Sequence, residues 1–246
     1  MNRSGDQMNN TLPSHDPFIK RLIAAQIERT DKPELVRLKY AGIPRLHRWA
    51  SVEAMQDSTD DKDLRIIDRF VSHVLALDDQ DKSDDSLFEG FLKKSAPKTS
   101  KRGMVLTGPP GTGKTSLAVA VLREWCKRTG GERPCRFIEF SPLIEKIKAG
   151  FGEEAPAIDL EGIARGNDFI VLDDLGQVRS TEWVSSQYYS LINALYVHRC
   201  TVIITTNIPL GEFESILSPA VRSRIGGMCE YIPLTGKDRR LEKTTG

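Results

Sequence analysis

The chain has 246 residues, of which 39% are hydrophobic and 28% are charged, and its formal net charge is +1. These values are ordinary for a soluble globular protein, so they exclude disorder throughout and do not by themselves require a nucleic acid or a membrane as partner. The length allows one sizeable domain with an appendage, because single cores of about 100 to 200 residues are the usual case.

The N-terminus and the cysteines indicate the compartment. The first residues, MNRSGDQMNNTLPSHD, are too polar for a signal peptide, and no apolar run approaches the roughly 20 residues that span a bilayer. The cysteines lack the spacing of a zinc site, and they are Cys126, Cys135, Cys200 and Cys229. We therefore expect a cytoplasmic protein with free, buried thiols and no membrane partner.

Residues 1–40 predict an N-terminal arm outside the main domain. A polar tail comes first, and a helix then begins near Asp16 as its N-cap, with Pro17 in the first turn. The apolar residues of this helix recur at helical spacing and its other face is basic, which is typical of a segment that binds a partner. Packing back onto the same chain is the alternative.

The remaining elements follow in chain order. Residues 61–77 have apolar positions at helical spacing, and the polar, charged residues 78–103 predict an exposed connection. Short apolar runs then alternate with helical stretches, and the candidate strands are 104–107, 136–140, 169–173, 201–206 and 230–234. This alternation predicts an α/β fold with a parallel sheet flanked by helices, and a ligand site at the carboxyl ends of the strands.

A glycine-rich loop with one lysine lies between the first of these strands and the next helix. The sequence GPPGTGKTS fits the pattern G-x-x-x-x-G-K-(S/T) in the strand–loop–helix context that this pattern requires. Its N–H groups can surround phosphate oxygens, its lysine can reach the β and γ phosphates, and its threonine hydroxyl can bind Mg²⁺. The residues predicted to bind ATP are Gly108, Pro109, Pro110, Gly111, Thr112, Gly113, Lys114, Thr115 and Ser116.

Three later segments of the chain carry polar or charged side chains that could act on a bound nucleotide. The buried run FIVLDD ends in Asp173, predicted to hold magnesium, and Asp174, predicted to orient or deprotonate the attacking water. Asn207 follows TVIITT and would emerge at the same sheet edge, where its amide could help to position that water. The segment SPAVRSRI presents Arg222 and Arg224, and an arginine delivered in trans to a γ-phosphate would complete an active site between subunits.

Taken together, these motifs resemble the AAA+ ATPases in order and spacing, and more narrowly the DnaC-type helicase loaders and the IstB-type transposition helper ATPases. The likeness covers about residues 41–243, from AGIPRLHRWASVE at 41–53 to LTGKDRRL at 234–241. It implies a P-loop NTPase domain of the AAA+ type over residues 41–246. Because only 22 residues follow Arg224, we expect no full C-terminal lid domain.

The resemblance also implies roles for individual residues. Lys114 and Thr115 become the ligands of ATP and Mg²⁺, and Asp173 and Asp174 become the metal-side acid and the catalytic acid. The other assignments are sensor 1 for Asn207, the arginine finger for Arg224 with Arg222 as second choice, and a sensor-2-like nucleotide contact for Arg240. An arginine finger implies a homo-oligomer whose active sites are shared between subunits.

Members of this clade have a helical insertion before the second acidic strand, and it lines a channel for DNA. Here the sequence KAGF places Lys148 and Phe151 one helical turn apart. A cation and an aromatic ring are the pair that holds a phosphate and stacks a base. Thr181 and Trp183 fall where the loader family has further DNA contacts, whereas packing of Phe151 and Trp183 in the interior is the alternative.

The function expected from the resemblance is that of an ATP-dependent helicase loader, which binds single-stranded DNA and delivers a replicative helicase through its N-terminal arm. A transposition helper, which binds duplex DNA and a transposase, is the alternative, and a nucleotide-bound scaffold with vestigial hydrolysis is the third. Aromatic residues favour single strands, because stacking requires an unpaired base face. Many AAA+ proteins have Glu where Asp174 stands, so we expect slow, Mg²⁺-dependent and DNA-stimulated ATP hydrolysis.

Overall fold

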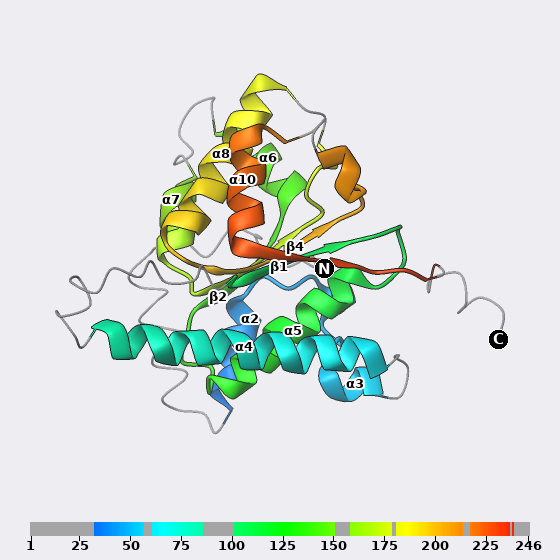
Figure 1. The fold of residues 1–246 in the computed structure, drawn as a ribbon, viewed down its shortest axis with the longest axis vertical. Coiled ribbons are helices and arrows are strands. Elements are labelled where there is room, and N and C mark those ends of the chain that lie inside the picture. The colour runs from blue at the N-terminus through cyan, green and yellow to red at the C-terminus, as the bar shows by residue number, and fades with distance from the viewer. Residues whose placement is uncertain are drawn as a thin grey trace, which may run out of the picture.

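A computed structural model describes the chain over residues 32–56, 61–85, 101–150, 158–178, 181–213, 217–236 and 238 (Figure 1). The helix predicted from Asp16 and the site candidates Phe151 and Arg240 lie outside these residues. The described part of the chain is a parallel sheet between two layers of helices, so the predicted α/β fold is confirmed.

The sheet has five strands in the order β2-β3-β4-β1-β5, and every neighbouring pair is parallel. The strands are β1 (Gly103–Thr107), β2 (Cys135–Glu139), β3 (Phe169–Asp173), β4 (Thr201–Thr206) and β5 (Cys229–Pro233). They coincide with the five predicted strands to within one residue at either end. Because β4 lies between β1 and β3, the carboxyl ends of these three strands meet at one edge of the sheet.

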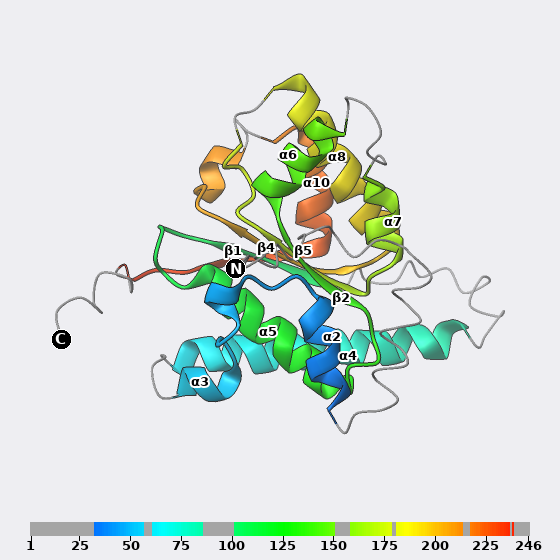
Figure 2. The ribbon, with the colours of Figure 1, turned by 180° about the vertical axis from the view of Figure 1, so that it is seen from behind.

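Helices cover both faces of the sheet (Figures 1 and 2). One face carries α2 (Pro33–Tyr40), α3 (Val52–Gln56), α4 (Asp61–Asp85) and α5 (Lys114–Arg128), with the short 3-10 helix η1 (Arg45–His47) nearby. The other face carries α6 (Phe140–Ala149), α7 (Leu160–Arg165), α8 (Glu182–Val197) and α10 (Pro219–Met228). A second 3-10 helix, η3 (Leu210–Glu212), follows β4. None of the helices in the described ranges has both the length and the apolar character needed to cross a bilayer.

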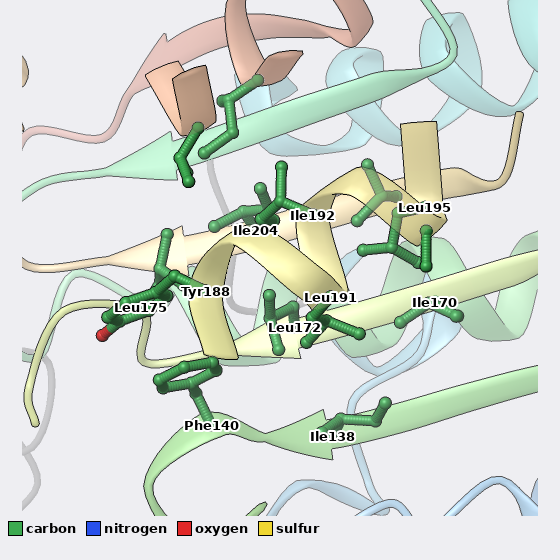
Figure 3. Close-up of a cluster of buried hydrophobic side chains, with 14 of the residues drawn as sticks. Ile138, Phe140, Ile170, Leu172, Leu175, Tyr188, Leu191, Ile192, Leu195 and Ile204 are labelled. Atoms are coloured by element: carbon green, nitrogen blue, oxygen red, sulfur yellow. The ribbon is translucent and has the colours of Figure 1, made fainter. Parts of the chain in front are cut away.

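The two layers are held by separate apolar clusters, one on each face of the sheet. Figure 3 shows the cluster under α8, which presents Tyr188, Leu191 and Leu195 to the strands at helical spacing. The Phe140 ring at the start of α6 stacks on Tyr188 with 4.2 Å between ring centroids. This packing fixes α6 and α8 relative to each other, and those helices carry two of the predicted DNA contacts.

The prediction of an exposed connection over residues 78–103 is wrong at both ends of this segment. Helix α4 continues to Asp85, and Asp78 is buried rather than exposed. Its carboxylate accepts a hydrogen bond from buried Arg102 at 2.5 Å and pairs with Arg133, which also binds Asp168. Charge alone suggested exposure, but these carboxylates and guanidinium groups neutralise one another where α4 meets the amino ends of the strands.

The described end of the predicted arm packs on the α/β core. Arg37 of α2 donates hydrogen bonds at 3.0 Å to the carbonyl oxygens of Gly131 and Glu132, which follow α5. Gly131 has φ +71, and a Cβ there would collide with the backbone of Pro33 and Glu34. Residues 32–40 are therefore held against the core, which leaves residues 1–31 as the part of the arm that we propose for partner binding. The prediction of free, buried cysteines is confirmed for all four.

Candidate functional site

The glycine-rich loop connects the end of β1 to the start of α5, as the sequence predicts. Its three glycines have positive φ angles, +151° at Gly108, +78° at Gly111 and +91° at Gly113. Side chains other than glycine rarely adopt such angles, so the glycines allow the backbone to curl in front of the helix. Gly113 is the N-cap of α5, so the N–H groups of the first helical turn, which an α-helix leaves without acceptors inside the helix, lie at the end of the loop.

Lys114 is folded back onto this loop. Its side chain is buried, and its Nζ donates hydrogen bonds to the carbonyl oxygens of Gly108 at 2.8 Å and Pro109 at 2.7 Å. The Thr112 hydroxyl donates to the Pro109 oxygen as well, at 2.9 Å. A bound phosphate group would take the place of these carbonyl oxygens as the acceptor for the ammonium, which already lies within the loop.

Asp173, at the tip of β3, receives two hydroxyl groups from neighbouring elements. Thr115 Oγ1 donates to its carboxylate at 3.0 Å, and Thr205 Oγ1 of β4 donates at 2.6 Å. Burial raises the pKa of Asp173 from its ordinary value of 3.8 to about 6, although both hydroxyl groups favour the ionised form. The arrangement joins the loop helix, the acidic strand and β4 around one buried carboxylate.

Asp174 and Asn207 face each other beyond this carboxylate. Asp174 has φ +61°, a left-handed conformation that is uncommon outside glycine and that occurs at functional sites. Its N–H donates to Thr205 Oγ1 at 3.0 Å, and Asn207 Nδ2 approaches its Oδ1 at 3.4 Å. The sheet order therefore brings together Thr115, Asp173, Asp174 and Asn207, all four of which were chosen from the sequence.

Thr205 is a site residue that the sequence reasoning missed. Its hydroxyl donates to Asp173 and accepts from the N–H of Asp174, so one group orients both acids. It is 1% exposed. A signal was present, because β4 ends in two threonines where an apolar residue would be expected in a fully buried strand.

The Gly-Ile-Pro segment lies beside the same loop helix. The Ser116 hydroxyl is 3.4 Å from His47 Nδ1, and Arg123 of α5 donates to the Arg48 carbonyl oxygen at 2.5 Å. Arg48 in turn binds the Ile43 carbonyl oxygen at 3.2 Å. The segment at 41–53 is thus part of the wall next to the loop.

The candidate arginine finger makes its contacts away from the loop. Arg224 of α10 donates to Asn193 Oδ1 at 2.8 Å and to the Tyr189 hydroxyl at 3.2 Å, and its guanidinium lies 4.8 Å from the Tyr189 ring centre. These partners hold the half-buried guanidinium against α8. Arg222 is two positions earlier in α10 and therefore points from a different side of the helix.

The predicted DNA contacts that the structure describes lie at the ends of α6 and α8. Lys148, near the end of α6, places its Nζ 5.5 Å from the centre of the Trp183 ring in the first turn of α8. The Trp183 ring is partly buried against the apolar cluster. One part of the ring therefore packs in the interior, and the other part stays accessible at the surface. Thr181 is the N-cap of α8, and its hydroxyl accepts from the Val184 N–H at 3.2 Å.

A parallel sheet in this order, with a glycine-rich lysine loop after β1 and paired acids at the end of β3, defines a P-loop NTPase of the AAA+ type. The model of the IstB-like ATP-binding protein family matches residues 92–245, more than half of the chain. The chain therefore belongs to this family of ATP-binding proteins.

Solved structures share the same fold. The chain is similar to the DnaC helicase loader with 24% identity and a TM-score of 0.58, over 78% of this chain and 100% of that one. It is similar to DnaI with 20% identity and a TM-score of 0.57, over 80% of this chain and 94% of that one. AMPPCP-bound DnaA from Aquifex aeolicus has 15% identity and a TM-score of 0.52, over 82% and 56% of the respective chains. No curated protein is significantly similar to the chain.

Proposed function

We propose that this protein is an ATP-dependent helicase loader that binds single-stranded DNA and delivers a replicative helicase. Membership in an ATP-binding family supports ATP as the ligand, and the fold shared with the DnaC helicase loader supports a helicase loader as the class of protein. The observation that carries the proposal is the pairing of Lys148 with Trp183, because it joins a cation and an aromatic ring at the ends of two helices.

The nucleotide part of the proposal rests on the loop and its neighbours. Lys114 and the N–H groups after Gly113 would bind the phosphates, with the other residues of the loop lining them. The Thr115 hydroxyl and the Asp173 carboxylate are 3.0 Å apart, and such oxygen ligands fit Mg²⁺. When bound, the ion would neutralise charge on the phosphates.

The remaining site residues would act on water and on charge. Asp174 would orient or deprotonate the attacking water, and Asn207, 3.4 Å from its carboxylate, would help to position that water. The guanidinium of Arg224 is held by residues of α8 rather than by the glycine-rich loop of the same subunit. This supports a role for Arg224 at the active site of a neighbouring subunit in a homo-oligomer. Arg240 would contact the nucleotide from the C-terminal segment.

The DNA part of the proposal rests on α6 and α8. Helix α6 follows β2 directly, and α8 follows the acids at the tip of β3, so both helices connect to the sheet at the edge that carries the loop. Lys148 is exposed and would bind a backbone phosphate, while the accessible part of Trp183 would contact a base, with Thr181 beside it. Phe151 is a further base contact that we propose, and it lies outside the described residues.

A transposition helper is the second candidate, and the IstB-like family model is the observation that favours it. The two candidates differ in the DNA that they bind and in their partner. In the presence of ATP, a loader should bind single-stranded oligonucleotides more tightly than duplexes of the same sequence. Equal or reversed preference, measured by fluorescence anisotropy, would favour the transposition helper.

Two variants test the surface itself. Lys148→Ala should flatten the dependence of log affinity on log salt by about 0.7, the slope of one phosphate contact on a single strand. Trp183→Leu keeps apolar packing but removes the ring, and it should weaken single-strand binding about tenfold, which is within the range for one stacked base. Lys127→Ala is the matched control, because Lys127 is an exposed cation on the opposite face of the sheet. Equal effects of all three variants would reject the proposed surface.

The partner is tested by capture of purified proteins. Deletion of residues 1–31 leaves α2 in place against the core, so ATP binding should persist while binding of the replicative helicase is lost. Retention of the helicase by the truncated protein would rule out the arm as its binding segment. Capture of the transposase instead of the helicase by the full chain would support the second candidate.

A further inference from the structure

The chain after β5 crosses directly over the glycine-rich loop. The Leu234 N–H donates to the carbonyl oxygen of Thr107 at 2.7 Å, and its side chain is buried. A Cβ added at Gly108 would collide with the Leu234 carbonyl oxygen, so the two backbones are in close contact at the first position of the loop. The segment that we call the C-terminal crossing, residues 234–236 and 238, is therefore anchored to the end of β1 through Leu234.

Asp238 lies at the end of this crossing and covers the middle of the loop. Gly236 has φ +150° with open space around it, which allows the chain to turn there. A Cβ added at Gly111 would collide with the carboxylate of Asp238. Gly111 is thus the point at which a negatively charged side chain touches the loop that is expected to hold phosphates.

The charge at this position is opposite to what a phosphate site requires. The loop offers N–H groups and the ammonium of Lys114, whereas a carboxylate adds negative charge beside the negative phosphates. We propose that Asp238 lowers the affinity of the loop for nucleotide phosphates and speeds nucleotide release. The proposal rests on the nucleotide site described above and adds a residue that sets how long the nucleotide stays bound.

The test is the release rate of a fluorescent ATP analogue, measured in stopped flow after addition of excess unlabelled ATP. Asp238→Asn preserves the shape of the side chain and removes its charge, and it should slow release about fivefold, the factor for two like charges about 4 Å apart in a water-like dielectric. Asp238→Glu keeps the charge and should stay within about twofold of the wild-type rate. Glu230→Gln makes the same chemical change at an exposed position of β5 and should have no effect.

Salt separates an electrostatic role from a structural one. Asp238 is only partly buried, and raising the ionic strength screens repulsion between charges that solvent reaches, so the difference between the wild type and Asp238→Asn should shrink at high salt. An unchanged or faster release in Asp238→Asn, or a difference that salt does not alter, would overturn the inference. Failure of the wild type to bind the analogue at all would instead contradict the proposed nucleotide site.

Discussion

Replacing Asp173 by Asn should stabilise the protein while removing its proposed metal ligand. Asp173 is 6% exposed, and burial raises its pKa from 3.8 to about 6. One pKa unit corresponds to about 1.36 kcal/mol, so ionisation of this buried group costs about 3 kcal/mol of folding free energy at pH 7. An asparagine keeps an oxygen that accepts the hydrogen bonds of Thr115 and Thr205 but carries no charge.

The pH dependence has a definite sign. Between pH 4 and 6 the folded state holds a proton on Asp173 that the unfolded chain has lost, so stability falls as pH rises through this window. The stability that the folded state gains by holding this proton is present in full below pH 4 and is lost well above pH 6. The free energy of unfolding of the Asn variant should not fall with pH in this way. At pH 7.5 it should exceed that of the wild type by up to about 3 kcal/mol.

The measurement is urea unfolding of the wild type and Asp173→Asn from pH 4 to 8, without magnesium or nucleotide. Glu230→Gln, an exposed acid on β5, is the control for loss of one carboxylate. Addition of Mg²⁺ with ATP should then stabilise the wild type more than Asp173→Asn. An Asn variant that is no more stable at pH 7.5, with an unchanged slope between pH 4 and 6, would refute the reasoning from burial.

Two further predictions concern groups far from Asp173. Arg224→Ala should abolish DNA-stimulated ATP hydrolysis while leaving ATP binding intact, as measured by phosphate release and nucleotide titration; normal turnover would show that the finger is another residue. Asp78→Ala should lower the free energy of unfolding by about 3 to 5 kcal/mol, because it leaves the buried guanidinium of Arg102 without this carboxylate. A loss below about 1 kcal/mol in chemical unfolding would show that solvent reaches this pair.

Much of the fold and of the candidate nucleotide site could be predicted from the sequence, because the signals are local. The five strands are continuous apolar runs, and the loop is a run of glycines around a lysine placed between a strand and a helix. Asp173 could be chosen because it ends a buried strand, and Asp174 and Asn207 because each follows one. Residue spacing along the chain is sufficient for such assignments, since the carboxyl ends of parallel strands share one edge.

The sequence could not show which side chains meet across that edge. The position of β4 between β1 and β3 makes Thr205 the group that orients both acids, and its hydroxyl meets Asp173 from 32 residues away. The same holds for Asp78, which looked exposed by composition and is buried with Arg102. Hydrogen bonds and ion pairs of this kind depend on how helices and strands pack, and no local pattern encodes that packing.

The sequence by itself therefore determined the class of fold, the loop and the acids. The tertiary structure decided the surroundings of those groups: the contact of Lys148 with Trp183, the contacts that hold Arg224 on α8, and the carboxylate of Asp238 against Gly111. The physical reason is that a strand or a loop is specified by neighbours along the chain. The charge and contacts around a functional group are set by residues that only folding brings near it.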